Sequence, residues 1–396
     1  MSGLADVVIV GAVRTAVGSF GGGLKDVAPA DLGALVVKEA LRRADTAPAD
    51  VGHVVMGQVI QSHPHDAYLA RVVAMKAGIP AAVPALTLNR LCGSGIQAIV
   101  SAAQMIRLGE CRVAVAGGAE SMSRSPYVVP AARWGAKMGE VGMLDAMLTV
   151  LTDPFGNGHM GITAENVAAQ CGIDRAAQDE FAVESHRRAS AAIREGRFKD
   201  QIVPVEVQTR KGVALFDTDE HVRHDASVED MAKLRPAFRK DGSVTAGNAS
   251  GLNDGAAAVV LMSAEEAKRR GLPVLARIVS WGHAGVGPEV MGLGPVEAVP
   301  VALERAGLKV ADLDVIESNE AFAAQACAVS RTLGLPADRT NPNGGAIALG
   351  HPVGASGAII TVKALYELAR SGGRYGLTTM CIGGGQGIAM VLERPA

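Results

Sequence analysis

The sequence has few aromatic residues, no long hydrophobic run and no cluster of positive charge. Its 396 residues include 2 Trp, 4 Tyr and 7 Phe against 48 Gly, a balance typical of closely packed backbone with many tight turns. No apolar stretch approaches the roughly 20 residues that cross a bilayer. The formal net charge is -2, and Lys and Arg are scattered, which argues against nucleic acid or an anionic membrane surface as a partner.

The chain also lacks the features of a secreted protein. A strand-like run at residues 7–10 follows almost directly on the first residue, without a charged segment and a long apolar segment, so we expect no targeting signal. The 5 cysteines are an odd number without paired spacing, which argues against a disulfide framework or a zinc ribbon. We therefore expect a protein with free thiols in a reducing cytoplasm.

Length and internal repetition predict two duplicated halves. A chain of 396 residues suits two or three compact units of about 150 residues each. Short apolar strands alternate with helical patterns, which is typical of an α/β fold with both faces of its sheets covered. Three short segments return 262 positions later in the chain: 40–44 as 302–306, 49–51 as 311–313, and 93–95 as 355–357.

Between the two halves the sequence changes to charged helices and polar links, which indicates an inserted domain. The predicted division is an N-terminal core half at 1–118 and 250–273, an inserted loop domain at 119–249, and a C-terminal core half at 274–396. A strand at 256–262 would return the chain to the first half. Asp31, Thr163 and Asp174 are placed to cap helices, and Gly172 and Gly196 to end them.

One stretch of the first half predicts a turn that delivers a cysteine to the start of a helix. Residues 84–88 are predicted as a strand, and Gly93 and Gly95 permit a sharp turn before apolar residues at helical spacing. Cys92 would then lie at a helix N-terminus, where the macrodipole favours a thiolate. Free cysteines are more often buried small hydrophobic residues, so this pattern alone leaves both interpretations open.

Three stretches of the second half also place reactive groups in turns. His351 lies in a glycine-rich loop, where it can accept a proton from a nearby thiol. Cys381 follows a predicted strand and precedes glycines whose N–H groups can face an oxyanion. Asn319 follows a strand at 315–316 and can supply a polar orienting group. Each pattern is weak alone, but duplicated halves place their turns at equivalent sheet ends, so we expect these residues to meet Cys92.

Five motifs, taken together and in order, resemble the signatures of the thiolase family. They are residues 89–95 (NRLCGSG), 117–123 (GGAESMS), 319–323 (NEAFA), 350–352 (GHP) and 381–385 (CIGGG). The resemblance covers essentially the full length and implies a thiolase-like α/β fold, with two duplicated halves in a five-layered αβαβα core plus an inserted loop domain. The chain looks similar to bacterial acetyl-CoA acetyltransferases, whereas segment 61–66 resembles the β-ketothiolases of broader range.

The resemblance implies an acyl-CoA C-acyltransferase that works through an acyl-enzyme. It would condense two acetyl-CoA into acetoacetyl-CoA and cleave short-chain 3-ketoacyl-CoA by thiolysis. Cys92 matches the nucleophile that carries the acyl group, His351 the base that activates it, and Cys381 the acid/base at the α-carbon. Asn319 would hold a water that forms one oxyanion pocket with His351, and the N–H groups of Cys92 and Gly383 would form a second.

Coenzyme A thioesters are then the substrates, and the resemblance implies no further cofactor and no metal. The residues implied in coenzyme A binding are Leu151, His159, Met160, Arg223, Phe238, Ala246, Ser250, Leu252 and Phe322. The inserted domain would cover the coenzyme, with Arg223 near its nucleotide, although Asp230 falls where the family has a serine. Thiolases are generally dimers or dimers of dimers, so we expect a homo-oligomer.

Other classes of protein fit part of the pattern. A thioesterase-type hydrolase would use Cys92, His351 and Asn319 with water as the acceptor, but it has no use for Cys381. A non-catalytic acyl-CoA binder would not need both cysteines and the histidine. A decarboxylating ketosynthase would carry a histidine in place of Asn319. The complete set of residues therefore favours a thiolase.

Overall fold

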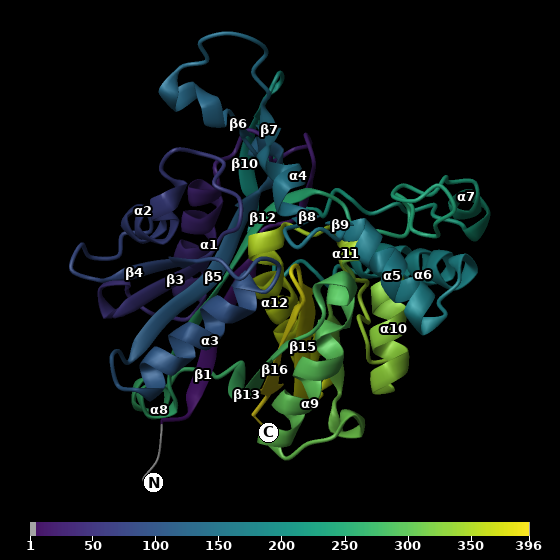
Figure 1. The fold of residues 1–396 in the computed structure, drawn as a ribbon. Coiled ribbons are helices and arrows are strands. Elements are labelled where there is room, and N and C mark those ends of the chain that lie inside the picture. Colours follow the sequence, from purple (N-terminus) through teal and green to yellow (C-terminus); the bar gives the residue numbers. More distant parts are fainter. Residues whose placement is uncertain (1–4, 396) are drawn as a thin grey trace.

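The computed structural model describes residues 5–395, which form a large mixed sheet with helices on both faces (Figure 1). The sheet has ten strands. In order across the sheet they are β14 (Val315–Ser318), β15 (Tyr375–Ile382), β16 (Gln386–Glu393), β13 (Ala276–Gly285), β1 (Val7–Arg14), β12 (Asn253–Ser263), β5 (Val113–Ser121), β3 (His53–Gly57) and β4 (Ala85–Leu88), with β2 (Gly18–Ser19) paired to β12.

The strand order is that of two similar halves joined at their first strands. The first half runs β1, β12, β5, β3 and the second runs β13, β16, β15, β14. Strands β1 and β13 meet antiparallel through the pairs Val8 with Arg277 and Ile9 with Ala276. Strands β3 and β5 begin 262 positions before β14 and β15, the offset found in the sequence repeat. The predicted duplication is therefore confirmed at the level of the sheet.

Helices cover both faces of each half. They are α1 (Pro29–Arg43), α2 (Leu69–Lys76), α3 (Ser94–Arg107), α8 (Ala264–Arg270), α9 (Gly294–Ala306), α10 (Ala323–Leu333), α11 (Ala346–Leu349) and α12 (Val353–Ser371). Helices α1 and α2 pack on the outer face of the first half and α9 on that of the second. Helices α3 and α12 lie together between the two halves. This arrangement gives the five layers that the family resemblance implied.

Alternation along the strands explains why each half needs two helical layers. Side chains of a strand point to opposite faces in turn. In β16, Ile388, Met390 and Leu392 join the central core around α3 and α12, whereas Ala389 and Val391 join the outer core under α9. All five side chains are fully buried, so both faces of the strand must be covered.

Two glycines let α3 and α12 approach at their starts. A Cβ atom on Gly95 would lie 2.3 Å from the backbone nitrogen of Ala358, and one on Gly357 would lie 2.4 Å from that of Ile96. These two glycines are equivalent in the sequence repeat. Their close approach brings together the turns that precede the two helices, and these turns carry Cys92 and His351.

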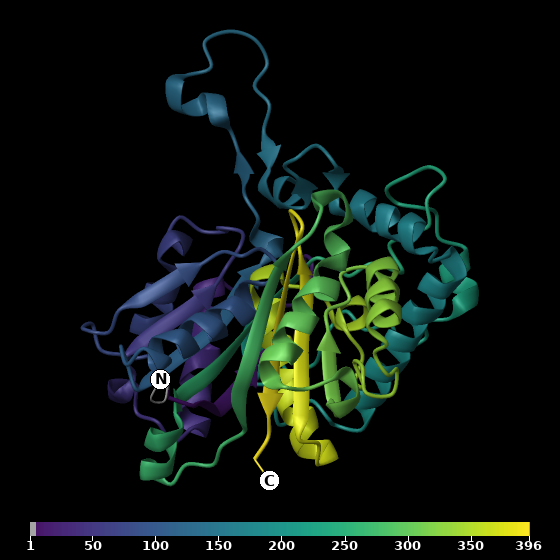
Figure 2. The same cartoon turned by 60° about the horizontal axis from the view of Figure 1, so that its bottom comes forward.

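The segment between β5 and β12 forms the region predicted as an inserted domain. It contains β6 (Tyr127–Val128), β7 (Leu144–Asp145), α4 (Ala146–Val150), β8 (Thr152–Asp153), β9 (Gly158–His159), α5 (Met160–Cys171), α6 (Arg175–Arg194), β10 (Val205–Thr209), β11 (Gly212–Phe216) and α7 (Val228–Ala232). The 3-10 helices of the chain are η1 (Pro48–Asp50), η2 (Asp66–Tyr68), η3 (Met122–Arg124), η4 (Pro130–Trp134), η5 (Pro288–Leu293) and η6 (Val310–Asp312). Residues 125–145, called the arm below, project from the body (Figure 2).

Some local predictions are confirmed and others are wrong. The Asp174 carboxylate accepts the Ala177 N–H and caps α6, and Gly172 ends α5 in the left-handed conformation. Asp31 does not cap α1, because the helix begins at Pro29, which suits a first helical position, and places Asp31 inside the first turn. Thr163 lies inside α5, and the cap there is the side chain of His159.

Strand β5 continues through a pair of glycines. Gly117 and Gly118 both pair with β12 inside the strand. A Cβ atom on Gly117 would lie 2.1 Å from the carbonyl oxygen of Ala257, so these glycines serve close backbone approach and not a turn.

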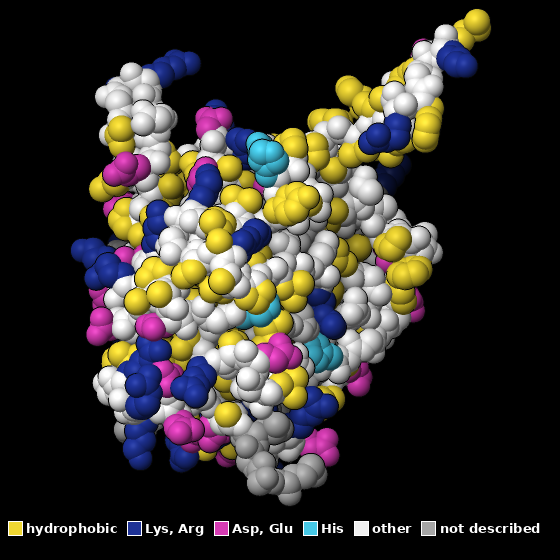
Figure 3. Space-filling model, turned by 90° about the vertical axis from the view of Figure 1, so that its left-hand side faces the viewer, with side chains coloured by type: hydrophobic (Ala, Val, Ile, Leu, Met, Phe, Trp, Pro, Cys, Tyr) yellow, Lys and Arg dark blue, Asp and Glu magenta, His cyan; other side chains and the backbone are white. Residues whose placement is uncertain are grey.

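The surface carries charges of both signs. On the face shown in Figure 3, Lys and Arg side chains are interspersed with Asp and Glu. Within residues 5–395, no helix has the length and apolar character needed to span a membrane.

Candidate active site

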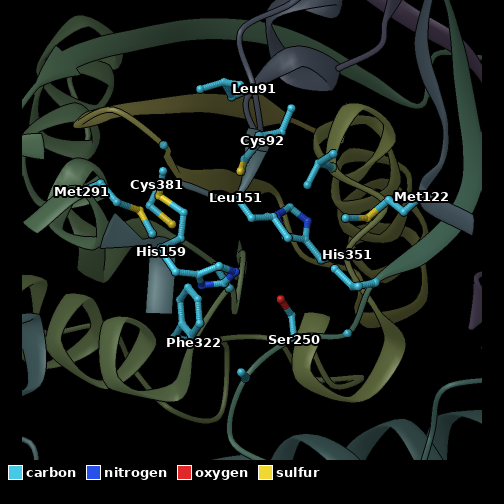
Figure 4. A pocket seen from close by; sticks show the side chains of 18 of the residues that line it. Leu91, Cys92, Met122, Leu151, His159, Ser250, Met291, Phe322, His351 and Cys381 are labelled. Atoms are coloured by element: carbon cyan, nitrogen blue, oxygen red, sulfur yellow. The ribbon is translucent and has the colours of Figure 1, made fainter. Parts of the chain in front are cut away.

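One pocket of about 370 Å³ lies where the turns of both halves meet. Its wall includes Cys92 from the turn before α3, His351 from the turn before α12, Cys381 from the end of β15 and Gly383 from the turn directly after that strand. Figure 4 shows the sulfur of Cys92 and the ring of His351 facing the same space. Four of the five predicted catalytic residues are thus brought together, and the fifth, Asn319, is not part of this wall.

A tight turn holds Cys92 just before α3, as the sequence predicted. The Asn89 side chain accepts the Leu91 N–H at 2.8 Å, and Leu91 takes a left-handed conformation with φ 47°. The Ser94 hydroxyl donates to the Leu91 carbonyl at 2.6 Å and accepts the Arg90 N–H at 2.9 Å. These bonds hold the backbone of the turn on both sides of Cys92.

The environment of Cys92 disfavours a resting thiolate. Burial raises the pKa of the Cys92 thiol, while the N–H groups of Gly383 and of Cys92 itself, which face the sulfur, lower it. The expectation that the helix start would make this thiol more acidic is therefore wrong, because burial outweighs the N–H groups. The same two N–H groups are those expected to receive the oxygen of an acyl group on this sulfur.

His351 is a buried, neutral base with one free ring nitrogen. Its Nδ1 lies 2.6 Å from the hydroxyl oxygen of Ser356, and that hydroxyl also lies 2.9 Å from the carbonyl oxygen of Pro352. Because a carbonyl can only accept, the single hydroxyl proton goes to Pro352, and Nδ1 carries the ring proton. The Nε2 atom has no hydrogen-bond partner among residues 5–395. Burial lowers the pKa of His351 to about 4.

Cys381 lies deeper in the pocket than Cys92. Its side chain is fully buried at the end of β15, within a cluster that includes Met160, Met291 and Phe322. Burial first, and then the neighbouring Cys92, raise the pKa of the Cys381 thiol. A thiol of raised pKa gives a thiolate that is a stronger base, which suits removal of a proton from carbon.

The opposite pKa shifts predict a neutral resting pair of Cys92 and His351. The thiol stays protonated around pH 7 because its pKa is raised, and the imidazole stays neutral down to about pH 4 because its pKa is lowered. We expect the thiolate absorbance of the protein and of the Cys92→Ser variant to coincide up to about pH 8, near the ordinary cysteine pKa. A difference that titrates below about pH 6 would contradict the neutral pair.

All but one of the residues predicted to bind coenzyme A line this pocket. They are Leu151, His159, Met160, Phe238, Ala246, Ser250, Leu252 and Phe322. His159 stacks on Phe238 with ring centroids 4.7 Å apart, and Phe238 meets Phe322 edge-on at 6.3 Å. These three rings form one apolar wall between the inserted region and α10.

Two predicted residues lie outside the pocket. Arg223 is exposed, and its backbone N–H donates to Nδ1 of His186. Asn319 is buried beside a separate cavity of about 20 Å³ that Ser356 and Lys363 also line, and its amide oxygen and nitrogen have no hydrogen-bond partner within residues 5–395. The roles of both residues stay predictions.

Sequence reasoning missed much of the pocket wall. The additional residues are Val59, Leu91, Met122, Leu148, Val150, Ala237, Thr245, Ala249, Gly251, Met291, Ala321 and Val353. Leu91, Met122 and Ala321 stand in the motifs given above, but most of the others are apolar side chains outside any motif, and no sequence signal separates those from core residues. Ser356 could have been found, because the 262-residue offset places it on Ser94.

A buried carboxyl group, also missed, supports the pocket from behind. Glu120 accepts the N–H groups of Val59 at 2.9 Å, Ile60 at 3.2 Å and Gly354 at 2.9 Å. Burial raises the pKa of Glu120 to about 8, against the lowering by these bonds. Glu120 thereby ties the loop after β3 to the start of α12.

The fold and the pocket together define a class of enzyme. A thiol that shares a pocket with a neutral imidazole, with N–H groups facing its sulfur and a second buried thiol in the same wall, is the equipment that an acyltransferase needs to carry its acyl group on cysteine. Residues 7–265 match the family model described as Thiolase, N-terminal domain, and residues 272–394 match Thiolase, C-terminal domain.

Comparison of the chain with individual proteins leads to the same family. The chain is 67% identical over 390 residues to the beta-ketothiolase BktB of Cupriavidus necator, covering 98% of this chain and 99% of that protein. It is 54% identical to an acetyl-CoA acetyltransferase of Pseudomonas aeruginosa, with 98% and 99% of the two chains covered. The chain therefore belongs to the thiolase family, and it is an acyl-CoA acyltransferase.

Solved structures give the same result for the fold. The crystal structure of the Bacillus anthracis acetyl-CoA acetyltransferase has a TM-score of 0.97 at 47% identity and covers 100% of both chains. That of human mitochondrial 3-ketoacyl-CoA thiolase in complex with CoA has a TM-score of 0.96 at 46% identity and covers 99% of both. The thiolase-like fold predicted from the sequence is confirmed.

Proposed function

We propose that this chain catalyses the reversible condensation of two acetyl-CoA and the thiolysis of short-chain 3-ketoacyl-CoA through an acyl group on Cys92. The observation that carries this proposal is the meeting of Cys92, His351 and Cys381 in one apolar pocket. Carbon–carbon bond cleavage needs a nucleophile for the carbonyl and a separate acid for the α-carbon. Two thiols and one imidazole meet that need.

In the first half of thiolysis, Cys92 receives the acyl group. Nε2 of His351 takes the Cys92 proton, and the sulfur attacks the 3-keto carbon of the substrate. The bond between the 2- and 3-carbons then breaks, and the Cys381 thiol protonates the 2-carbon, which releases acetyl-CoA. The enzyme is left with acyl-Cys92, an imidazolium and a Cys381 thiolate.

In the second half, free coenzyme A takes the acyl group away. The Cys381 thiolate accepts the coenzyme A thiol proton, and the coenzyme A sulfur attacks the acyl carbon. The bond to Cys92 breaks, and the imidazolium of His351 returns its proton to the Cys92 sulfur. Condensation of two acetyl-CoA is the reverse sequence, in which the Cys381 thiolate removes an α-proton.

Two polar pockets would stabilise the charge that develops on oxygen in these steps. The N–H groups of Cys92 and Gly383 face the Cys92 sulfur and suit the oxygen of its tetrahedral adduct. We infer that Asn319 holds a water that, with His351, stabilises the enolate oxygen. The unpaired amide of Asn319 and the free Nε2 of His351 support this role, since both are buried polar groups without a partner among the described residues.

Coenzyme A would enter along the wall of His159, Phe238 and Phe322. Its pantetheine suits this apolar surface, and Arg223 would meet the nucleotide outside the pocket. An acidic side chain near the phosphates of the nucleotide would repel them, but the Asp230 carboxylate lies 2.8 Å from the Lys233 ammonium group, which offsets its charge. No further cofactor enters any step of this proposal.

The apolar wall beside Cys92 favours acceptance of acyl chains longer than acetyl. Val59, Met122 and Val353 belong to one apolar cluster beside Cys92, and all three line the pocket. None of residues 61–66, all of them described, lines it, so the unusual segment does not itself set the acyl range. Instead, Asp66 folds that loop by accepting bonds from Gln58, Ser62 and His63.

Rates with substrates of increasing length test this range. One methylene group changes discrimination by about 10- to 200-fold when a pocket rejects it. We expect kcat/KM for five-carbon 3-ketopentanoyl-CoA to stay within about tenfold of that for four-carbon acetoacetyl-CoA. A fall of about 100-fold would restrict the enzyme to acetoacetyl-CoA.

A thioesterase is the second candidate, and one observation disfavours it. Hydrolysis would need a water beside Cys92 and no acid at an α-carbon, yet the wall opposite His351 is formed by the fully buried Cys381. Coenzyme A release from acetyl-CoA in the absence of any acceptor measures this activity directly. We expect it to be negligible beside condensation.

We further propose a homo-oligomer, a dimer of dimers, in the cytoplasm. The arm supports assembly, because Trp134 is 83% exposed and Met138 98% exposed, and large apolar side chains of this kind mark interaction surfaces. Five free cysteines suit a reducing compartment. The division into residues 1–118 with 250–273, 119–249 and 274–396 stays part of the proposal. Sedimentation equilibrium tests the assembly, and a monomer would contradict it.

A further inference from the structure

The side chain of Asn253 joins two segments that are far apart in the sequence. Asn253 is the first residue of β12 and is fully buried. Its Oδ1 accepts the backbone N–H of His351 at 2.8 Å, and its Nδ2 donates to the carbonyl oxygen of Gly18 at 3.0 Å. Because His351 offers a donor and Gly18 an acceptor, only one orientation of the amide satisfies both.

The Asn253 amide also lies against the residue before His351. Gly350 has a φ of 107°, which favours glycine, and a Cβ atom there would lie 2.4 to 2.6 Å from the amide atoms of Asn253. Any side chain at position 350 would push the amide away. The backbone of Gly350 and His351 is therefore seated directly on Asn253.

Asn253 contacts the pocket wall as well. Its backbone N–H donates to the Met122 sulfur at 3.4 Å, and Met122 lines the pocket. A Cβ atom on Gly251, another lining residue, would lie 2.9 Å from the Asn253 Oδ1. Asn253 itself does not line the pocket, so it acts through its neighbours.

The hydrogen bond between the His351 N–H and the Asn253 side chain joins the two halves of the core. Asn253 belongs to β12, which pairs with β5 in the half that carries Cys92, whereas His351 belongs to the other half. The Nδ1–H group of His351 donates to the Ser356 hydroxyl oxygen, which fixes the ring proton on Nδ1, but Ser356 lies on the same half as His351. The Asn253 bond ties the base to the half of the nucleophile.

We propose that Asn253 is a positioning residue that sets Nε2 of His351 within proton-transfer reach of Cys92. This inference rests on the proposed role of His351 as the base for Cys92. A misplacement of about 1 Å in such a pair lowers the rate by about 10²-fold. Loss of Asn253 should therefore slow acylation of Cys92 without weakening the binding of coenzyme A.

The test compares Asn253→Ala and Asn253→Asp with a matched control, Asn343→Ala. Asn343 is also buried and makes two side-chain hydrogen bonds, to Arg197 and Glu367, but does not line the pocket. We expect Asn253→Ala to lower kcat for thiolysis about 10²-fold per folded molecule with the KM for coenzyme A unchanged. Asn343→Ala should keep kcat even if its unfolding temperature falls equally.

Asn253→Asp should restore the rate because it keeps an acceptor for the His351 N–H. Its carboxylate also favours an imidazolium, so the acidic limb of the pH profile should move to higher pH. The inference is overturned if Asn253→Ala acylates Cys92 as fast as Asn343→Ala, or if Asn253→Asp is as slow as Asn253→Ala at every pH. His351→Ala separates the two proposals: normal acylation by that variant would refute the proposed function itself.

Discussion

Cys92→Ser is expected to form no acyl adduct when mixed with acetyl-CoA or acetoacetyl-CoA, and to lose both condensation and thiolysis. The serine hydroxyl has a much higher pKa than a thiol, and the neutral His351, with its pKa lowered to about 4, is too weak a base to ionise it. Removal of a catalytic nucleophile lowers kcat on the order of 10⁶-fold. Intact-protein mass spectrometry measures the adduct, and steady-state kinetics measures the loss.

Cys111→Ser is the matched control for this variant. Cys111 is also a partly buried free cysteine, but it does not line the pocket. It should acylate and turn over like the unmodified protein. An acyl mass that persists on the Cys92→Ser variant would show that another residue carries the acyl group.

The Cys381→Ala variant should retain the covalent step and lose catalysis at the α-carbon. Cys92 keeps its turn, its base and the N–H group of Gly383, so the acyl adduct forms. Condensation and thiolysis both need a proton to move at carbon, and the loss of such an acid/base lowers the rate by about 10³-fold. Adduct formation and turnover, measured on one sample, separate the two steps.

Cys327→Ala serves as the control here, because Cys327 is a free cysteine in a different cavity, between α6 and α10. It should leave both steps intact. If Cys381→Ala still condenses acetyl-CoA at the normal rate, the base at the α-carbon must be another group.

The fold was largely predictable because the duplication of the two halves appears in the sequence as a constant offset between similar segments. The offset of 262 residues, seen in short Ala-rich segments, recurs in the starts of the strands β3 and β5 against β14 and β15. Sequence patterning did not show that the two halves form one sheet, because the pairing of Val8 with Arg277 joins residues with no local signal. Nor did it show that Gly117 and Gly118 continue a strand, since a close approach and a turn both favour glycine.

The site residues that stand in motifs were predictable from the sequence. The residues that reach the site only through tertiary packing were not. Cys92, His351 and Cys381 stand in distinctive turns, and the structure brings them together. The predicted direction of the Cys92 pKa shift was wrong, because the side chains packed around Cys92, such as Val59, Met122 and Val353, come from segments that are remote in sequence. Asn253 begins β12 outside every motif, and Met122 begins the 3-10 helix after β5 within the 117–123 motif, but only the folded chain shows what these two residues contact.

Exchange of label between acetyl-CoA and free coenzyme A by the Cys381→Ala variant tests the central claim, that one thiol carries the acyl group and the other only moves protons. Coenzyme A has a thiol that ionises near the ordinary cysteine pKa of about 8.5, so it can attack acyl-Cys92 without help in mildly alkaline solution. We predict that the variant exchanges label at about pH 8.5 while forming no acetoacetyl-CoA. If exchange stops together with condensation, the two thiols do not have separate duties, and the account is contradicted.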